Sequence, residues 1–263
     1  MRPGTGLFTH ALLRLPGANL AAGLSRADEG APDFAAALAQ HQRYCEALAD
    51  CGLSLTVLPA DARHPDGCFV EDTALVTPRG AIITRPGAPS RRGEVDVIEA
   101  ALRGLFPRIP RIEAPGTLDA GDVCEADGHF LIGLSARTNE AGARALAGLL
   151  VELGYRSDVI DIREVPSLLH LKSGLAYLGE GRMLATGDVP RSRALAAYEI
   201  VDVPPGERYA ANALRVNGRV LVAEGYPGTR AAIESCGFDT VAIEVSEYRK
   251  LDGGLSCLSL RWQ

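Results

Sequence analysis

The sequence contains no hydrophobic run as long as a membrane span, no Cys-x-x-Cys pair and no Cys/His cluster with zinc spacing. Its opening stretch, residues 1–20, is interrupted by glycine, proline, histidine and arginine, so it lacks the apolar middle of a signal peptide. We therefore expect a cytoplasmic protein that does not bind a membrane. In that reducing compartment the six cysteines are expected to be free thiols.

Basic residues are fewer than acidic ones. The 27 lysines and arginines stand against 33 aspartates and glutamates, which gives a net charge of −6 at pH 7. A basic patch typical of a nucleic-acid interface is absent, so we expect no nucleic-acid partner and a ligand that is small or cationic. The chain of 263 residues, 47% of them hydrophobic, is long enough to bury a substantial core without disulfides or metals.

A loose repeat runs along the chain. In residues 212–245, a strand, a tight turn at Asn217-Gly218, a second strand, a helix and a third strand follow one another. Thr229 is expected to cap that helix, which should end near Gly237. The same order recurs in four other stretches, so that units of about 30–50 residues fill the chain: residues 10–59, 73–114, 120–161 and 174–203.

The helices and strands of these units follow from their apolar spacing. The helix in residues 33–51 has apolar side chains near helical periodicity, while residues 108–114 are expected to form a strand and residues 192–198 a short helix. A unit of this kind cannot bury its own apolar face. Either the five units close into a ring, which would leave few free sheet edges, or they form an open α/β sheet with hairpin insertions.

Cys257 and His170 are the candidates for a nucleophile and a base. Cys257 follows the flexible pair Gly253-Gly254 and precedes an alternating apolar strand, a setting that can expose a thiol in a cleft. His170 lies between leucines just before another apolar strand. A buried cysteine and a satisfied core histidine are the commoner occurrences of these residues. The two gain weight together because a base within reach activates a thiol.

Several carboxylates occur in apolar surroundings. Glu71 and Asp72 lie in FVEDTALV, which is expected to be a strand in which adjacent side chains face opposite sides. Asp119 and Asp122 flank Ala120-Gly121 in LDAGDV. Such acids either pair with arginine or loop N–H groups, or form a socket for a cation. Asp66, in HPDG, is a further candidate or a turn residue.

Arginines occur at one position of the repeat, between a second strand and its helix. Arg85, Arg91 and Arg92 lie there in one unit, and Arg137 lies there in the next. They are either surface residues or a clamp for a carboxylate, which a guanidinium matches with two parallel hydrogen bonds. Acids for a cation and arginines for a carboxylate together describe a site for a zwitterion with a cationic side chain. Arginine and its derivatives fit that description.

Six segments resemble the dimethylarginine dimethylaminohydrolases, a family of the pentein superfamily of guanidine-modifying enzymes: FVEDTALV, ITRPGAPSRRGE, LDAGDV, IGLSARTNEAGA, LHLKSGLAYL and SEYRKLDGGLSCLSLRW. The similarity extends over nearly the whole chain, and the last motif is highly specific. The resemblance implies an α/β fold, a five-bladed pseudo-symmetric α/β propeller of ββαβ units, formed by residues 1–263 as a single catalytic domain.

The resemblance also implies roles for individual residues. Cys257 matches the nucleophile, His170 the general acid/base, and Asp119 the acid that orients the histidine. Asp72 and Asp252 match positions that hold the guanidinium, with Glu71 close by, while Arg91 and Arg137 match the carboxylate clamp. The remaining matches hold the amino-acid end of the substrate: Asp66 and the backbone at Leu24 and Leu251.

The implied reaction is hydrolysis of Nω-methylated arginines to citrulline and dimethylamine or methylamine, through a covalent S-alkylthiouronium on the cysteine. It needs no metal and no organic cofactor, although a thiol beside an imidazole could bind inhibitory zinc. Lys172 stands where related deiminases carry an acid, which favours a methylated substrate because one hydrogen-bond acceptor is missing there.

Other functions remain open at this stage. Arginine deimination and amidino transfer use the same superfamily chemistry, and a non-catalytic arginine-binding module would use the same pocket without the reaction. The sequence does not specify an oligomeric state, so a homodimer is also left open. Nor does it say whether a loop near Leu24 closes over the substrate.

Overall fold

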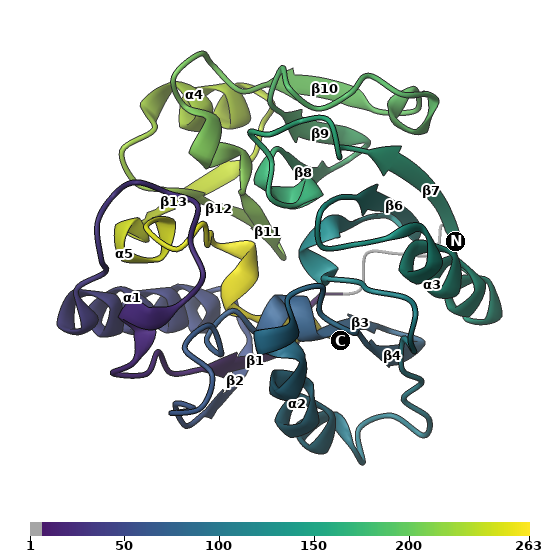
Figure 1. Cartoon of the computed structure of the whole chain (residues 1–263). Coiled ribbons are helices and arrows are strands. Elements are labelled where there is room, and N and C mark those ends of the chain that lie inside the picture. The colour runs from purple at the N-terminus through teal and green to yellow at the C-terminus, as the bar shows by residue number, and fades with distance from the viewer. Residues whose placement is uncertain (1–6) are drawn as a thin grey trace.

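Five small sheets surround a common centre in the computed structural model, which describes residues 7–263 (Figure 1). Of the two arrangements that the repeat left open, the closed ring, which the family resemblance implies, is the one observed. The first six residues, part of the stretch in which no signal peptide is expected, lie outside the described residues. None of the helices in residues 7–263 has the length and apolar character needed to cross a membrane.

Four of the five sheets follow one pattern. An inner strand pairs antiparallel with a middle strand, and the middle strand pairs parallel with an outer strand. The remaining sheet has two strands and only the antiparallel pair. In chain order the sheets are β3 (Ala74–Thr77) and β4 (Gly80–Ile83); β5 (Val123–Ala126), β6 (His129–Leu134) and β7 (Arg156–Asp161); β8 (Leu175–Gly179), β9 (Arg182–Ala185) and β10 (Glu199–Asp202); β11 (Leu214–Val216), β12 (Arg219–Ala223) and β13 (Asp239–Ile243); and β14 (Leu260–Trp262), β1 (His10–Arg14) and β2 (Ser54–Leu58).

Helices provide most of the connections between middle and outer strands, and they lie around the outside of the ring (Figure 1). Two of them begin at a residue whose side chain caps the helix: Asp33 accepts a hydrogen bond from Ala36 N (2.7 Å), and Asn139 accepts one from Gly142 N (2.8 Å). The helices are α1 (Phe34–Asp50), α2 (Val95–Leu102), α3 (Glu140–Glu152), α4 (Pro227–Ser235) and the short α5 (Ser246–Arg249).

Three local predictions are wrong. α4 begins at Pro227, and Thr229 lies inside it, because proline suits the first helical position and the Glu207 carboxylate accepts the free N–H groups of Gly228 and Thr229. Residues 108–114 contribute only one bridge, Ile83 to Arg111, rather than a strand. The short helix expected at 192–198 is a single 3-10 turn at 193–195.

The first and last strands of the ring share one sheet. β14 pairs antiparallel with β1, and Trp262 stacks on His10 with the ring centroids 5.6 Å apart. The Asn217-Gly218 hairpin forms as predicted, with Asn217 in the left-handed region at φ 54°.

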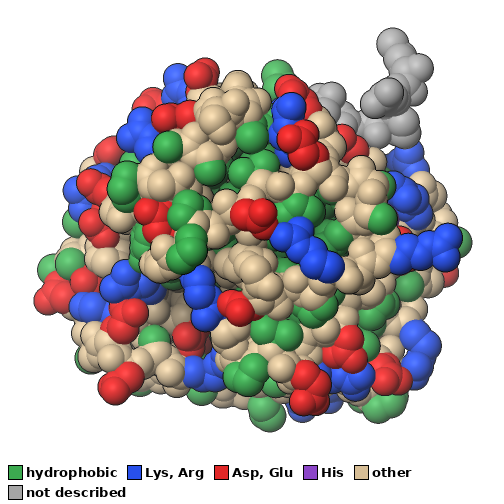
Figure 2. Space-filling view, turned by 90° about the horizontal axis from the view of Figure 1, so that it is seen from above, with side chains coloured by type: hydrophobic (Ala, Val, Ile, Leu, Met, Phe, Trp, Pro, Cys, Tyr) green, Lys and Arg blue, Asp and Glu red, His purple; other side chains and the backbone are tan. Residues whose placement is uncertain are grey.

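Five clusters of buried apolar side chains fill the spaces within and between the sheets. On the face seen in Figure 2, lysine and arginine are interspersed with aspartate and glutamate, and no large area carries one sign of charge.

Candidate active site

A short 3-10 turn precedes the inner strand of every sheet. Segment FVEDTALV, expected to be one strand, divides in this way: residues 70–73 form a turn and β3 begins at Ala74. The five turns are η2 (Val70–Thr73), η4 (Ala120–Asp122), η5 (Leu171–Ser173), η7 (Arg208–Ala211) and η8 (Ser256–Leu258). Because the inner strands surround one centre, these turns bring distant parts of the chain together.

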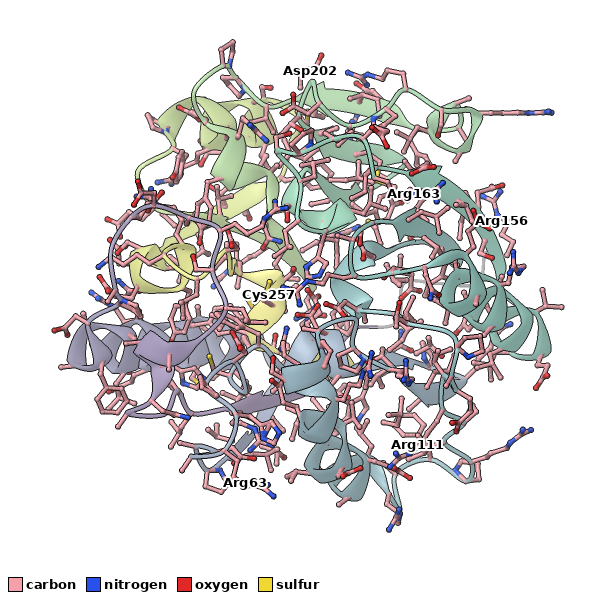
Figure 3. The ribbon with its side chains drawn as sticks, viewed as in Figure 1. Arg63, Arg111, Arg156, Arg163, Asp202 and Cys257 are labelled. Atoms are coloured by element: carbon pink, nitrogen blue, oxygen red, sulfur yellow. The ribbon has the colours of Figure 1, made fainter. Side chains whose placement is uncertain are left out.

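The three candidate catalytic residues and the predicted guanidinium ligand Asp72 lie on, or directly before, four of these turns. Asp72 is part of η2, Asp119 and His170 are the residues directly before η4 and η5, and Cys257 is in η8. Figure 3 shows Cys257 near the centre of the ring, away from the labelled arginines of the periphery. The thiol and the imidazole thus meet at one site, as the enzymatic prediction requires.

One narrow cavity of about 30 Å³ is lined by both Cys257 and His170. Most of the predicted binding residues line it too: Leu24, Asp66, Asp72, Arg91, Arg137, Leu251 and Asp252. The lining also includes Phe69, Leu169 and Gly253, which sequence reasoning did not select. Each of the three is a sequence neighbour of a selected residue or of its motif, which is the only signal that could have found them.

His170 is held between two carboxylates. Its Nε2 lies 3.0 Å from Asp119 Oδ2, and its Nδ1 lies 4.0 Å from Asp72 Oδ1. Asp119 is fully buried, and its other oxygen accepts the N–H of Gly87 at 2.8 Å. Gly121 has no room for a side chain here, since a Cβ would lie 2.7 Å from both Asp72 Oδ1 and His170 Nδ1. The imidazole orientation is therefore fixed from both sides.

The charges around His170 and Cys257 set their protonation. Burial alone would lower the pKa of His170, but Asp72, Asp122 and Asp119 outweigh it and raise the pKa to about 9. Burial raises the pKa of the Cys257 thiol to about 12, and the charges of Glu71 and Asp72 add to this effect. At neutral pH the ligand-free site therefore holds an imidazolium beside a neutral thiol.

The guanidinium groups of Arg91 and Arg137 differ in their carboxylate partners. Arg91 is buried, with Nη1 bonded to Asp72 Oδ2 at 2.5 Å and Nη2 bonded to Glu94 Oε2 at 2.9 Å. Arg137 is half-buried, and among residues 7–263 no carboxylate pairs with its guanidinium. Only Arg137 thus offers a free guanidinium to a ligand carboxylate.

Glu94 is a charged residue beside the candidate site that the sequence did not indicate. Although burial raises the pKa of Asp72, the charges of His170 and Arg91 outweigh it and hold that pKa below its ordinary range. Glu94 in turn fixes Arg91, which anchors Asp72 in its ionised form. The other two arginines of this segment bond to backbone carbonyl groups: Arg85 to Gly116 O and Arg92 to Pro86 O.

A loop that follows Gly23 covers part of the cavity. The N–H of Leu24 donates to Asp66 Oδ1 at 3.0 Å, and the N–H of Arg26 donates to Asp252 Oδ2 at 2.6 Å. Two acids predicted to hold substrate are therefore occupied by the loop backbone in this structure. Burial raises the pKa of Asp66.

Glu71 is the one predicted binding residue that does not line this cavity. It lines a larger one of about 820 Å³, where Lys172 Nζ lies 2.6 Å from Glu71 Oε1 and Ser256 Oγ donates to Glu71 Oε2 at 2.7 Å. The expectation that Glu71 and Asp72 face opposite sides is thus met, although a turn rather than a strand separates them.

One group of side chains could gather around a metal ion. Ligand atoms of Asp72, Asp119 and His170 lie within 4.8 Å of one another. Each carboxylate already accepts strong hydrogen bonds, Asp72 from Arg91 and Asp119 from Gly87, and His170 lies between them. These partners suit a proton-transfer role for the histidine.

No family model matches the chain. Among curated proteins it is 46% identical over 257 residues to the N(G),N(G)-dimethylarginine dimethylaminohydrolase of Pseudomonas aeruginosa, covering 97% of this chain and 100% of that protein. The protein of the same name from Streptomyces coelicolor is 36% identical over 253 residues, covering 95% and 96% of the two chains. The chain belongs to the dimethylarginine dimethylaminohydrolase family.

Solved structures agree with this membership. A cysteine-to-serine mutant of the Pseudomonas aeruginosa dimethylarginine dimethylaminohydrolase, complexed with citrulline, matches with a TM-score of 0.94 at 45% identity, over 97% of this chain and 100% of that chain. The N-terminal domain of a cyanobacterial arginine dihydrolase matches with a TM-score of 0.86 at 16% identity, over 97% of each chain, a likeness of fold alone. The predicted pentein fold, a five-bladed α/β propeller, is confirmed.

Proposed function

We propose that this member of the dimethylarginine dimethylaminohydrolase family is a dimethylargininase, which hydrolyses Nω-methylated arginines to citrulline and an alkylamine. The observation that carries this proposal is the convergence of Cys257, His170 and the ionised Asp72 in one narrow cavity. The family membership supports the reaction, and the cavity supports the roles of the residues. We further propose that residues 1–263 act as one catalytic domain.

The substrate binds with its guanidinium toward Asp72 and its carboxylate toward Arg137. Asp72 carries a negative charge in the cavity, which suits a flat cation, and Arg137 has a guanidinium available for a carboxylate. Asp252, Asp66 and the backbone at Leu24 and Leu251 surround the remaining space. A carboxylate that fixes the guanidinium in plane also orients its central carbon for attack by Cys257 from one face.

The cavity must widen before this binding. About 30 Å³ is too small for an arginine side chain. The hydrogen bonds from Leu24 N to Asp66 and from Arg26 N to Asp252 close the loop over the cavity. When this loop opens, Asp66 and Asp252 lose these backbone donors. Asp66 then accepts the amino group of the substrate, and Asp252 accepts its guanidinium.

Binding of the cation then favours the thiolate. The positive guanidinium beside Cys257 lowers the pKa of a thiol that burial holds at about 12, and the thiol proton leaves to solvent. The thiolate attacks the guanidinium carbon to give a tetrahedral adduct. Protonated His170 donates its proton to the methylated nitrogen, and the alkylamine departs as the carbon–nitrogen bond breaks.

Hydrolysis of the resulting S-alkylthiouronium uses the same histidine. Neutral His170 accepts a proton from water, whose oxygen adds to the carbon to give a second tetrahedral adduct. Collapse of this adduct breaks the carbon–sulfur bond, and the hydroxyl proton moves to the departing sulfur. The products are citrulline, a neutral Cys257 thiol and a protonated His170, which is the starting state.

Product analysis tests the proposal. The protein is incubated separately with asymmetric dimethylarginine, monomethylarginine and arginine, and citrulline and the released amine are measured. We expect citrulline with dimethylamine or methylamine from the methylated substrates, and much less citrulline with ammonia from arginine. Ammonia from arginine as the main product would instead identify a deiminase. A guanidino product formed on added glycine or lysine would identify an amidinotransferase.

A further inference from the structure

One of the five turns, η7, has no residue in the mechanism above. Asp72, Asp119, His170 and Cys257 lie in or directly before η2, η4, η5 and η8, whereas η7 contributes nothing that lines the cavity. The residue that follows η7 is Asn212, which is buried. Its side chain reaches two of the other turns.

Asn212 joins the histidine turn to the nucleophile turn. Its amide Nδ2 donates to Lys172 O in η5 at 2.9 Å and to Ser256 Oγ in η8 at 3.0 Å. Its Oδ1 accepts the N–H of Ser256 at 2.9 Å. All three contacts are buried or half-buried, so each one limits how far the two turns can move apart.

The packing around Asn212 leaves little freedom. A Cβ on Gly254 would lie 2.5 Å from Asn212 Oδ1, so glycine is required for the nucleophile turn to approach this side chain. Tyr209, within η7, also donates its hydroxyl to Gly253 O at 2.8 Å. The η7 segment therefore holds the nucleophile turn at residues 253 and 256, on both sides of the bend that leads to Cys257.

We propose that Asn212 is a positioning residue, which holds the thiol of Cys257 in register with the imidazole of His170. It contacts neither substrate nor the reacting atoms and acts through Ser256 and Lys172. The inference rests on the roles proposed above for Cys257 and His170. Since a displacement of about 1 Å in a reacting group can reduce turnover about 100-fold, loosening this link should affect the chemical step more than binding.

Two variants separate positioning from general stability. Asn212→Ala removes the three hydrogen bonds. Asn217→Gly is the matched control, because Asn217 also makes three hydrogen bonds across the chain, with Phe8 N, Phe8 O and Cys51 O, but away from the site. Glycine is used there because Asn217 has a positive φ. The midpoint of urea unfolding should fall in both variants.

The kinetic readout decides the proposal. We expect kcat for asymmetric dimethylarginine to fall at least tenfold in Asn212→Ala with KM changed less than threefold, and both constants to stay within twofold in Asn217→Gly. Equal kcat values in the two variants, or a rise in KM alone, would overturn the positioning role. If Asn212→Ala does not fold, Asn212→Ser replaces it, with kcat expected to fall at least threefold and an unchanged kcat counting against the proposal.

Alkylation of Cys257 keeps this test separate from the proposed activity. Iodoacetamide labelling, followed by mass spectrometry, should be at least threefold faster at Cys257 in Asn212→Ala than in wild type, and unchanged in Asn217→Gly. Wild-type protein that forms no citrulline would refute the proposed function, while the labelling rates would still show whether Asn212 holds the thiol. Unchanged labelling in Asn212→Ala would overturn the inference.

Discussion

Two cavities in the described part of the chain differ in size, lining and electrostatics. The larger, of about 820 Å³, is lined by side chains such as Lys172, Arg156 and Trp262, and the smaller, of about 30 Å³, by Cys257 and His170. The two cavities share no lining residue, yet neighbouring residues of one turn can line different cavities. Ser256 lines the larger cavity and Cys257 lines the smaller one. The comparison shows that convergence of reactive groups, and not volume, marks the proposed reaction site.

The ion pairs of the two regions differ as well. Around the smaller cavity, three carboxylates share two cations, which leaves an acidic site for a cationic ligand: Asp72, Asp119 and Glu94 pair with Arg91 and the His170 imidazolium. In the larger cavity, Glu71 is paired with Lys172 at 2.6 Å and lies 3.6 Å from Arg261 Nη2. Glu71 is therefore compensated, and a cationic ligand gains less there.

The largest difference in citrulline formation is expected between serine variants of the cysteines that line the two cavities. Cys257→Ser should reduce citrulline formation about 1000-fold or more, because a hydroxyl in place of the thiolate is a poor nucleophile. Cys124→Ser, in the larger cavity, is the matched control and should keep activity within about threefold, with some loss of stability from its buried position. Citrulline assays and thermal unfolding measure both; comparable losses in the two variants would falsify the choice of nucleophile.

Protonation of His170 gives the next largest effect. Its pKa of about 9 in the folded state lies above the ordinary value of 6.5. The charged ring therefore stabilises the fold fully below about pH 6.5, and this stabilisation, about 3 kcal/mol at most, is lost as the pH rises through about 9.

Urea unfolding at pH 6 and pH 10 checks this prediction. Wild type should lose more stability between these pH values than His170→Asn, which has no charge to lose at this position. Thiol and tyrosine ionisations occur in both proteins and largely cancel in the comparison. Equal pH dependence in the two proteins would contradict the raised pKa.

A smaller effect is expected from the arginines. Arg137→Ala should raise KM for dimethylarginine about tenfold with a smaller change in kcat, because it removes a charge-assisted contact to the substrate carboxylate. Arg156→Ala, which removes an exposed arginine of the larger cavity, should leave KM within about twofold. Steady-state kinetics of both variants measure the difference, and an unchanged KM in Arg137→Ala would exclude it from the carboxylate clamp.

The smallest effect is expected at the boundary between the cavities. Lys172 lowers the pKa of Cys257 from outside the substrate pocket. Lys172→Met should therefore raise the pKa of the Cys257 thiol. We expect kcat/KM to fall by only about threefold at neutral pH, and the pH profile of kcat/KM to shift to higher pH. A pH–rate series tests this, and a large rise in KM without such a movement would place Lys172 in direct contact with substrate.

Much of the local structure could be predicted because it depends on neighbours in sequence. Asn217-Gly218 encodes a two-residue turn, and Asp33 caps a helix with its own side chain. The start of α4 was mispredicted because its free N–H groups bond to Glu207, which is distant in sequence. Cys257, His170 and Asp119 were candidates from their sequence context, the resemblance supplied their roles, and the structure brings these three together.

The rest of the site depends on long-range contacts that no local pattern specifies. Periodicity indicates that Glu71 and Asp72 face opposite sides, but which one reaches the thiol depends on the turn that precedes β3. Glu94 acquires its role only through buried Arg91, and Asn212 only through Lys172 and Ser256. These side-chain contacts form only when the closed ring brings the separate segments together.

The pairing of β14 with β1 has a consequence for biosynthesis. The Cys257 turn is followed directly by the strand that pairs with β1, so Cys257 and this closing strand are synthesised one after the other. A partly synthesised chain that already carries Asp72, Asp119 and His170 therefore lacks Cys257, the thiol that we propose as the nucleophile. The proposed nucleophile and the strand that closes the ring therefore come from one continuous segment of the chain.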